Sequence, residues 1–428
     1  MNNIAGVDPP NPTPGLAGAD FTAEQVVREV IEHEGRISFA RFMEIALFAP
    51  QVGYYMRGGG VGGDGDYITS PVTHPVFGAL VGLQLEQMWN ILEQPNPFWV
   101  VEPGAGSGSL ARDILRYVQV HLPDFARCVN YLAVDVHQPS VWNDQPLPEW
   151  AIAQTLPITG VIGCILTNEL FDAFPVNRFV FQNGEVLEVY VTLRGGHLVE
   201  ELDLPATTAI SQRLDALGIV LPEGFQGEMN LGLDSWVSMA ASSLTKGFIL
   251  TIDYGARAEE LYSHERTEGT LRSYYRHTLS ASPYQWVGFQ DLTAHVDFSR
   301  LVEYGKSLDL IPLGYTSQRQ FLKNLGIDVF LKALTRRSVP SGERYASQMA
   351  MRELIRPGGM GDFKVLVQGK GVELPRIYGF SHSNSLLERL HRHVDTLDVP
   401  TPTADHARLL EAKYPHLGYN FHDKWPTE

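Results

Sequence analysis

The feature that most constrains the fold is the segment Val100–Gly108, which reads Val-Val-Glu-Pro-Gly-Ala-Gly-Ser-Gly. It continues an apolar run, Phe98–Val101, that is typical of a strand buried on both faces of a parallel sheet. Glu102 ends this run, and glycines then occupy alternate positions before the helical pattern of Leu110–Val120. Because glycine adopts backbone torsions that other residues resist, a ligand can lie directly against this bend. The segment therefore predicts a ligand-binding strand–bend–helix unit.

The central part of the chain repeats this alternation of strand and helix. Apolar runs of strand length recur at residues 131–134, 161–166 and 247–252, and a helical pattern at 235–244 precedes the last of them. A further apolar run at 363–368 follows a long intervening stretch. This rhythm predicts an α/β fold with a doubly wound sheet, whose ligand crevice lies at the carboxyl ends of the strands.

Other segments carry different patterns. Residues 21–48 predict two helices that break near Gly35, with Ser38 placed to cap the second. The alternating stretch 186–204 predicts a hairpin that turns at Gly195-Gly196. We divide the chain into a flexible leader (1–20), a helical N-terminal region with a glycine-rich loop (21–97), a Rossmann-like core with the hairpin insertion (98–256), an inserted helical and loop region that contacts substrate or forms a lid (257–356), a final core strand (357–372) and a C-terminal helical extension (373–428).

Composition and charge exclude several classes of protein. The 428 residues include 33 Lys+Arg and 49 Asp+Glu, a net charge of −16, whereas proteins that bind nucleic acid usually carry a basic surface. Two cysteines, Cys128 and Cys164, are too few for a disulfide scaffold or a cysteine-rich metal module. No His-Glu-x-x-His zinc motif is present. We therefore expect neither a metal nor a nucleic-acid partner.

The sequence also bears on location. No apolar run approaches the roughly 20 residues that cross a bilayer. Residues 1–20 contain four prolines but no Arg or Lys, so they lack the charge of a secretion signal or a transit peptide. We expect a cytoplasmic protein with no membrane partner, and the oligomeric state stays open.

Details of the glycine bend decide which ligand it suits. A dinucleotide site requires Gly-x-Gly-x-x-Gly or Ala, but Ser109 stands at the third position, and the bend lacks the lysine of a P-loop. An acidic residue before Gly-x-Gly-x-Gly is instead the pattern of class I methyltransferases that use S-adenosylmethionine (SAM). SAM carries a cationic amine, which Glu102 could bind while the helix start holds the carboxylate. We expect Gly104, Gly106 and Gly108 to line this cofactor.

Acidic residues follow two further strands of the predicted sheet. Asp135 comes directly after the strand 131–134, where an acid accepts the ribose hydroxyls in such folds; a helix cap or a surface acid is the alternative. Glu169 and Asp172 follow the strand 161–166 and could bind a cationic acceptor such as a guanidinium by bidentate hydrogen bonds. Acids that complement the dipole of a helix N-terminus are the alternative there.

Six segments, in the same order along the chain, are similar to motifs of the MidA-like methyltransferases. That family includes the mitochondrial complex I assembly-factor arginine methyltransferase. Single motifs would be weak, whereas six in order over roughly residues 37–369 are specific. They are Gly65–Pro71, the glycine loop after Glu102, Asn168–Ala173, Ile252–Gly255, Asp291–Phe298 and Asn324–Ile327.

The resemblance implies a SAM-dependent methyltransferase with a Rossmann-like class I sheet, a helical N-terminal extension and an inserted region. It implies S-adenosylhomocysteine as the product and an arginine of a protein partner as the acceptor. Carried over by motif, the resemblance implies that Glu169 and Asp172 act at the edge where the methyl group is transferred. It implies that His295 and Asp297 lie in the inserted region that closes over this edge. The residues that it assigns to the cofactor are Glu102, Gly104, Gly106, Gly108, Asp135, Asn168, Asp66, Thr69 and Ser70.

Two of these assignments keep alternatives. His295, with an ordinary pKa near 6.5, could accept a proton or orient the acceptor; it could equally be a structural residue paired with Asp297 or a backbone carbonyl. The acceptor could instead be a small molecule methylated on N, O or C. A noncatalytic assembly factor of the same fold is a further alternative, against which the intact set of cofactor residues argues.

Overall fold

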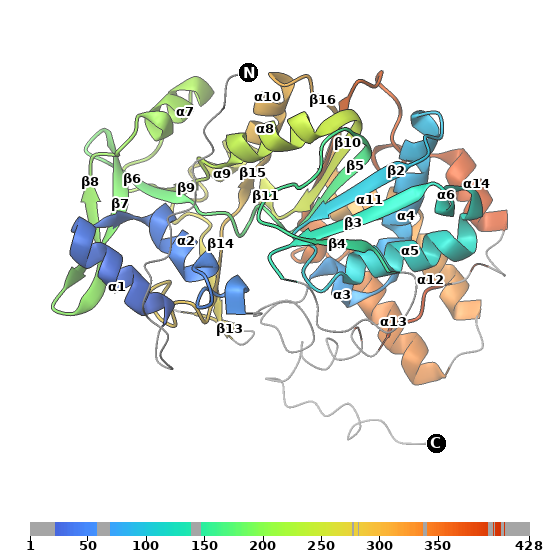
Figure 1. Cartoon of the computed structure of the whole chain (residues 1–428), viewed down its shortest axis with the longest axis horizontal. Coiled ribbons are helices and arrows are strands. Elements are labelled where there is room, and N and C mark those ends of the chain that lie inside the picture. The colour runs from blue at the N-terminus through green and yellow to red at the C-terminus, as the bar shows by residue number, and fades with distance from the viewer. Residues whose placement is uncertain are drawn as a thin grey trace.

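The computed structural model describes residues 22–57, 69–137, 147–275, 278–280, 282–336, 340–392, 397, 399–403 and 406. The expected leader, Asp66 and the glycine-rich loop from residue 58 to residue 68 lie outside the described residues. Figure 1 shows two β-sheets side by side, and the helices between residues 327 and 392 lie on the side of the larger sheet that faces away from the smaller one.

A seven-stranded sheet forms the core of the molecule. Its strands are β2 (Phe98–Pro103), β3 (Val129–Asp135), β4 (Glu149–Ile152), β5 (Val161–Asn168), β10 (Leu244–Asp253), β16 (Ile311–Ser317) and β17 (Lys364–Lys370). They run in the order β16-β17-β10-β5-β2-β3-β4, and every pair is parallel except the two that β17 makes. This order confirms the predicted α/β fold with a Rossmann-like sheet.

Helices cover both faces of this sheet, because its strands are apolar on both sides. The successive residues Val100 and Val101 of β2 belong to two different clusters of buried side chains, one on each face. The first cluster includes α4 (Val76–Ile91), α5 (Ser109–His121), α11 (Gln318–Asn324), α12 (Ile327–Arg336), α13 (Ser341–Glu353) and α14 (Asn384–Arg392), and the second includes α8 (Leu233–Ser243) and α10 (Phe298–Lys306).

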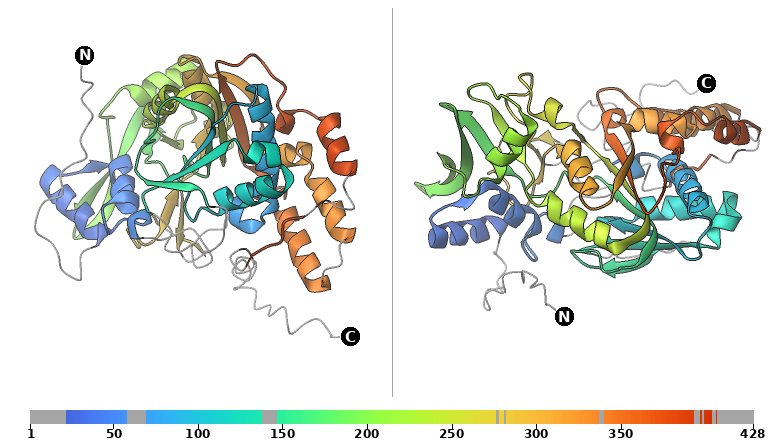
Figure 2. Two further views of the ribbon diagram at one scale, coloured as in Figure 1. Left: turned by 45° about the vertical axis from the view of Figure 1, so that its right-hand side comes forward. Right: turned by 90° about the horizontal axis from the view of Figure 1, so that it is seen from above.

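A smaller antiparallel sheet lies beside the core, next to the N-terminal helices (Figure 2). It contains the predicted hairpin, which turns at Gly195-Gly196. The predicted helix break is also confirmed: Gly35 ends the first helix with φ 83°, and Ser38 Oγ accepts the Arg41 N–H at 3.2 Å. The elements are α1 (Ala23–Glu34), β1 (Ile37–Ser38), α2 (Phe39–Phe48), β6 (Asn177–Gln182), β7 (Glu185–Arg194), β8 (His197–Asp203), α7 (Ala209–Leu217) and β9 (Gln226–Met229).

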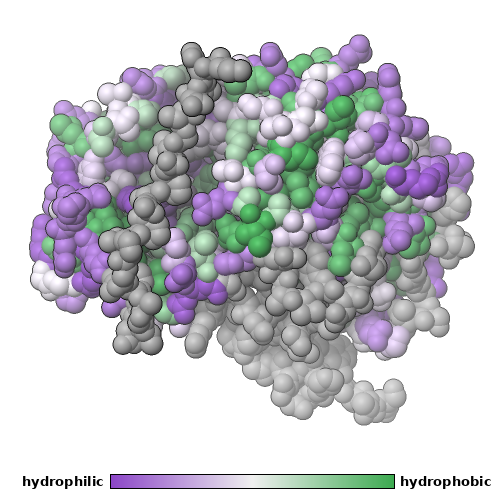
Figure 3. Space-filling view, in the orientation of Figure 1, coloured by the Kyte–Doolittle hydropathy of each residue, from purple (hydrophilic) through white to green (hydrophobic). Residues whose placement is uncertain are grey.

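The two sheets differ in the surface above them. On the face shown in Figure 3, hydrophobic residues gather over the seven-stranded sheet, and hydrophilic residues predominate over the smaller one. The remaining elements are short. They are α3 (Ser70–Thr73), α6 (Pro123–Ala126), β11 (Gly255–Ala256), α9 (Ala258–Leu261), β12 (Arg272–Tyr275), β13 (Thr278–Leu279), β14 (Asp291–Thr293) and β15 (Val296–Asp297), with 3₁₀ turns at Tyr55–Arg57, Met360–Asp362 and Tyr378–Phe380.

One boundary differs from the sequence prediction. Residues 257–356 were expected to be an inserted region of loops and helices, yet β16 within them is an edge strand of the central sheet. Pro312 and Gly314 interrupt its pattern, and its pairing with β17 shifts register between them. Every residue of this strand is exposed or half-buried. An edge strand with a bulge shows neither a continuous apolar run nor a clean alternation, so the sequence pattern conceals it.

Candidate active site

The glycine bend follows β2 and turns the chain into α5. Gly104, Gly106 and Gly108 have φ angles of 71°, 55° and 68°, a region that favours glycine. The N–H of Gly104 donates to the carbonyl of Val134 at 2.8 Å, and the N–H of Gly106 donates to Asp135 Oδ2 at 2.8 Å. The bend is therefore tied to the carboxyl end of β3, and the structure brings the predicted Gly106 and Asp135 into contact.

Gly104 is a packing position as well as part of the bend. A Cβ atom there would lie 2.7 Å from Cδ1 of Leu170, and its positive φ would strain any side chain. We expect Gly104→Ala to lower the free energy of unfolding by about 2–3 kcal/mol. Leu170→Ala removes the clashing atoms, so the double variant should lose about 1 kcal/mol less than the sum of the single variants. Urea unfolding of the three variants measures this, and additive losses would contradict the contact.

Glu102 lies buried at the end of β2, with 3% of its surface exposed. The Tyr131 hydroxyl donates to its Oε2 at 2.7 Å. Burial raises the pKa of the Glu102 carboxyl from an ordinary 4.5 to about 8, an effect that the Tyr131 hydrogen bond opposes and the neighbouring Asp135 reinforces. A cation beside Glu102 would favour its ionised form, so this position suits a positively charged ligand group.

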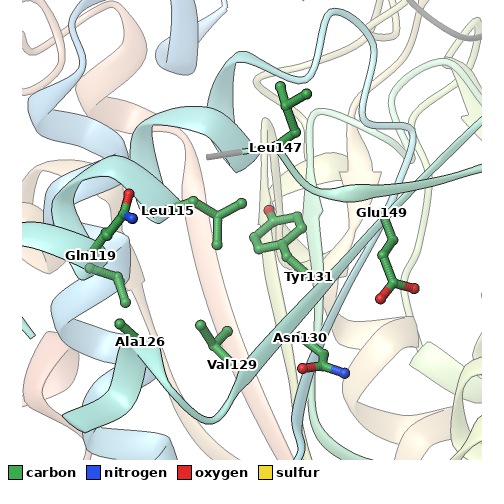
Figure 4. Close-up of a pocket in the computed structure, with 9 residues that line it drawn as sticks. Leu115, Gln119, Ala126, Val129, Asn130, Tyr131, Leu147 and Glu149 are labelled. Carbon is green, nitrogen blue, oxygen red and sulfur yellow. The ribbon is translucent and has the colours of Figure 1, made fainter. Parts of the chain in front are cut away.

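Tyr131 also lines a pocket of about 270 Å³ between α5, β3 and β4. In Figure 4 its ring stands among the lining residues, with Leu115 and Val129 on one side and Asn130 and Glu149 on the other. These β3 residues belong to the start of the strand, whereas Asp135 ends it. The pocket therefore lies beside the start of β3, and the hydrogen bond from Tyr131 to Glu102 links its lining to the predicted site residues.

Three carboxyl groups, those of the half-buried Glu169 and of the buried Asp172 and Asp253, meet where β5 and β10 end. Asp253 Oδ2 accepts the N–H groups of Leu170 and Phe171 at 3.1 and 2.9 Å, and Glu169 has a positive φ of 49°. These bonds hold residues 169–174 in a turn, so no helix begins there. The alternative in which Glu169 and Asp172 complement a helix N-terminus is therefore wrong.

Burial raises the pKa of all three carboxyl groups. The pKa of Glu169 rises to about 8 and that of Asp172 to about 6, while that of Asp253 lies well above its ordinary value. Repulsion adds to burial, because Asp172 raises the pKa of Glu169 and both raise the pKa of Asp253. A hydrogen bond with Tyr254 lowers the pKa of Asp172. Strongly shifted groups gathered at a sheet edge are typical of an active site.

The N-terminal extension reaches these acids through α3. The Ser70 N–H donates to Glu169 Oε1 at 3.0 Å, and Asn168 Nδ2 donates to the same oxygen at 3.1 Å. Ser70 Oγ donates to Gln318 Oε1 at 3.1 Å, which fixes its position. Thr69 precedes this helix as its N-cap. The structure thus brings the predicted Ser70, Asn168 and Glu169 into contact. The buried Asn168 Oδ1 has no hydrogen-bond partner among the described residues.

His295 lies beside this cluster but is paired elsewhere. Its Nδ1 is 3.2 Å from an amino nitrogen of Arg266, and its ring packs edge-on against Tyr254. Burial and the Arg266 charge lower the pKa of His295 to about 4, so it is a neutral, weak base at pH 7. Asp297 caps α10 and pairs with Arg213 at 2.9 Å. The alternative of a His295–Asp297 pair is wrong.

These shifts predict how stability depends on pH. The Glu102 and Glu169 carboxyls hold a proton more tightly in the folded chain, so stability falls as pH rises from 4.5 towards 8. The lowered pKa of His295 has the opposite effect, because the unfolded chain binds that proton more tightly, so it makes stability rise with pH between pH 4 and 6.5. Between pH 6.5 and 8 we expect a loss of about 1–2 kcal/mol per carboxyl. Urea unfolding across this range measures it, and an equal slope in Glu102→Gln would contradict the raised pKa.

Asp253 was not among the site residues predicted from the sequence. Asp253 appeared only within a motif, although it ends an apolar strand just as Asp135 does. That position is the signal that could have identified it, because the carboxyl ends of parallel strands meet at one edge of the sheet.

In the described part of the chain, no group of three or more His, Cys, Asp or Glu residues is arranged to hold a metal ion. No helix of that part is long and apolar enough to span a bilayer.

Comparison with known proteins decides the family. The profile of a family of S-adenosyl-L-methionine-dependent methyltransferases matches residues 80–316, more than half of the chain. The chain belongs to this family. It is a SAM-dependent methyltransferase, as the sequence predicts.

This methyltransferase is similar to mitochondrial protein arginine methyltransferases. The mitochondrial protein arginine methyltransferase NDUFAF7 homolog of Drosophila melanogaster is 27% identical over 403 residues, 86% of this chain and 90% of that protein. The mitochondrial protein arginine methyltransferase NDUFAF7 of Homo sapiens is 28% identical over 369 residues, 78% of this chain and 79% of that protein.

A solved structure shares the fold. A candidate methyltransferase from Burkholderia thailandensis bound to S-adenosyl-homocysteine superposes with a TM-score of 0.75 at 28% identity, over 84% of this chain and 95% of that one. The native structure of an uncharacterised protein of the same superfamily, also from Burkholderia thailandensis, superposes with a TM-score of 0.72 at 28% identity, over 84% of this chain and 94% of that one. The residues present here fit this cofactor, because the bend is built of glycines, Asp135 stands at its rim and the buried Asn168 Oδ1 needs a donor.

Proposed function

We propose that this methyltransferase transfers the methyl group of SAM to an arginine side chain of a partner protein. The observation that carries the proposal is the convergence of Glu169, Asp172 and Asp253 at the carboxyl edge of the sheet. Buried carboxyls are costly unless a cation neutralises them. The relatives' names, which describe protein arginine methyltransferases, support the same acceptor.

Glu169 and Asp172 are the residues that we assign to the acceptor. With a pKa of about 8, Glu169 is mostly protonated at pH 7 until a cation approaches. A guanidinium in the site would lower this pKa, and the carboxylates would then hold it by charge-assisted hydrogen bonds. Neutral acceptors gain no such stabilisation, so the acid cluster favours a cationic side chain.

The same carboxyls would take part in the transfer. Bound SAM supplies an electrophilic methyl group on its sulfonium. A guanidinium nitrogen that gains a methyl group must lose a proton, and Glu169 is placed to accept it. Asp253 acts as a positioning residue, because it holds the turn that carries Glu169 through the N–H groups of Leu170 and Phe171.

The cofactor would lie along the glycine bend. We assign Glu102 to its amine and Asp135 to its ribose, with Asn168 and α3 at the rim nearest the acids. Asp66, also assigned to the cofactor by resemblance, lies outside the described residues. His295 is a positioning residue in this proposal, because it packs against Tyr254 beside Asp172. The cytoplasmic location stays a prediction from the sequence, whereas the names of the relatives are mitochondrial.

Labelled SAM tests the acceptor. The protein is incubated with methyl-labelled SAM and a native lysate, and the label is then separated into protein and small-molecule fractions. We expect label in protein that yields methylarginine after acid hydrolysis, and none with Glu169→Gln. Label in the small-molecule fraction, or on another amino acid, would overturn the proposal in favour of a different acceptor.

A further inference from the structure

Three basic side chains lie around His295, close to the acids of the candidate site. We define the cation cluster as Arg266, Arg272 and Lys364. A guanidinium nitrogen of Arg266 lies 3.2 Å from His295 Nδ1. Arg272 in β12 is paired with Thr293 of β14, two residues before His295. After burial, the charges of the whole cluster lower the pKa of His295, so the three cations lie close together around one imidazole.

The cation cluster is not neutralised by neighbouring acids. Among the described residues, no acidic side chain forms an ion pair with any of its members, although the chain carries a net charge of −16. By contrast, Arg178, Arg213 and Arg300 of nearby elements each pair with an acidic side chain. Arg272 is exposed, and the other two members of the cluster are half-buried. Because grouped cations repel one another, an anion that binds among them is stabilised by all three.

The cation cluster lies at the same edge of the sheet as the acid cluster (Glu169, Asp172 and Asp253). Lys364 begins β17 and is paired in the antiparallel ladder with Asp253, the last residue of β10. Along this edge the sheet places β2, which leads into the glycine bend, then β5, which leads into Glu169 and Asp172, then β10 and then β17. The acid cluster therefore lies between the cofactor bend and the cation cluster.

The edge between the two clusters is open to solvent. Tyr254 bonds Asp172, and its ring packs against His295. Glu169, Tyr254 and His295 are each half-buried, so part of each is exposed. Neighbouring strands lie about 4.8 Å apart, which separates β5 from β17 by about 10 Å, and an extended chain covers about 3.3 Å per residue. An acceptor with its arginine at the acid cluster would therefore place a residue about three positions away at the cation cluster.

We propose that the cation cluster binds an acidic side chain of the acceptor protein, within about three residues of the arginine that is methylated. This inference rests on the proposed function, and it adds a feature by which the enzyme selects one arginine among many. A carboxylate there would be held by charge-assisted hydrogen bonds. SAM also carries a carboxylate, but we assign that group to the start of α5, beside β2 and three strands away from β17.

Three matched peptides test the cation cluster. Each is Gly/Ser-rich with one arginine, and each carries asparagine, aspartate or lysine about three residues from that arginine, before it in one series and after it in another. Titration calorimetry measures their binding to the enzyme loaded with S-adenosylhomocysteine, so that no turnover occurs during the titration. We expect aspartate to bind about fivefold more tightly than asparagine in one series, and lysine to bind more weakly than asparagine. High salt should reduce both differences.

Variants of Arg272 identify the group that is responsible. Because Arg272 is exposed, its replacement should spare the core. Arg272→Gln should remove most of the gain from aspartate. Arg272→Glu should reverse the preference so that the lysine peptide binds more tightly than the aspartate peptide, a result that a merely structural role would not give. Arg376→Gln, at an exposed arginine outside the cluster, is the matched control and should keep the preference for aspartate.

The outcomes separate the cation cluster from the proposed function. If the peptides bind alike and are methylated with SAM, the role of the cluster is refuted and the arginine acceptor stands. If aspartate tightens binding through Arg272 but no peptide is methylated, the cluster stands as an anion site and the arginine acceptor fails. Binding of none of the peptides overturns both proposals. A loss of SAM affinity in Arg272→Gln without peptide would assign the cluster to the cofactor carboxylate and overturn its role with the acceptor.

Discussion

Replacing Glu169 with glutamine is expected to lower kcat about 100- to 1000-fold while the affinity for SAM stays within about twofold. Glutamine keeps an oxygen that can accept the Ser70 N–H at this position, so the turn and α3 should stay in place. It cannot ionise, and it therefore neither neutralises a guanidinium nor accepts its proton. Single-turnover methylation of a protein acceptor and calorimetry with SAM measure the two quantities separately.

Glu223→Gln is the matched control for this variant. The Glu223 carboxylate also accepts a backbone N–H, that of Asn183 at 2.9 Å, but in an exposed turn of the smaller sheet. We expect its kcat to equal that of the unaltered protein. A Glu169→Gln enzyme that retains full turnover would remove Glu169 from the acceptor site, and a parallel loss of SAM affinity would move it to the cofactor site instead.

The second large effect is expected from Asp135→Ala, which should weaken SAM binding about 100-fold. The Asp135 carboxylate has two tasks in the proposed site: Oδ2 accepts the Gly106 N–H, and the group would bind the ribose hydroxyls. Alanine removes both, whereas asparagine keeps a neutral acceptor for Gly106. We therefore expect Asp135→Asn to show a smaller loss, about tenfold, in the same calorimetric titration.

An aspartate with similar geometry provides the control. Asp362 Oδ2 accepts the N–H of Gly358 at 2.7 Å, outside the glycine bend. Asp362→Ala should leave SAM affinity unchanged. A loss of SAM affinity in Asp135→Ala alone would then reflect contacts with the cofactor, and not the general cost of leaving a glycine N–H without its acceptor. Equal affinity in Asp135→Ala and the unaltered protein would show that the ribose lies elsewhere.

Much of the fold follows from local patterns. The apolar runs became β2, β3, β5, β10 and β17, and the glycine pair at 195–196 became the turn of a hairpin. The break at Gly35 and the cap at Ser38 need only residues within one helical turn. Patterns of this kind survive in the sequence because each strand or turn is specified by neighbours along the chain. β16 escaped prediction for the converse reason, since its bulge and half-buried edge position leave no regular pattern.

The features of the candidate site likewise fall into those that local sequence specifies and those that depend on the tertiary structure. The sequence by itself determined the glycine bend, the acids at the strand ends and the family, because side-chain order along a βα unit dictates what faces its crevice. Only the tertiary structure brought together Ser70, Glu169 and Asp253, which lie far apart in the chain. The raised pKa values of Glu169 and Asp253 arise from burial and from charges brought close in space, as does the pairing of His295 with Arg266, and none of these is a property of a linear segment.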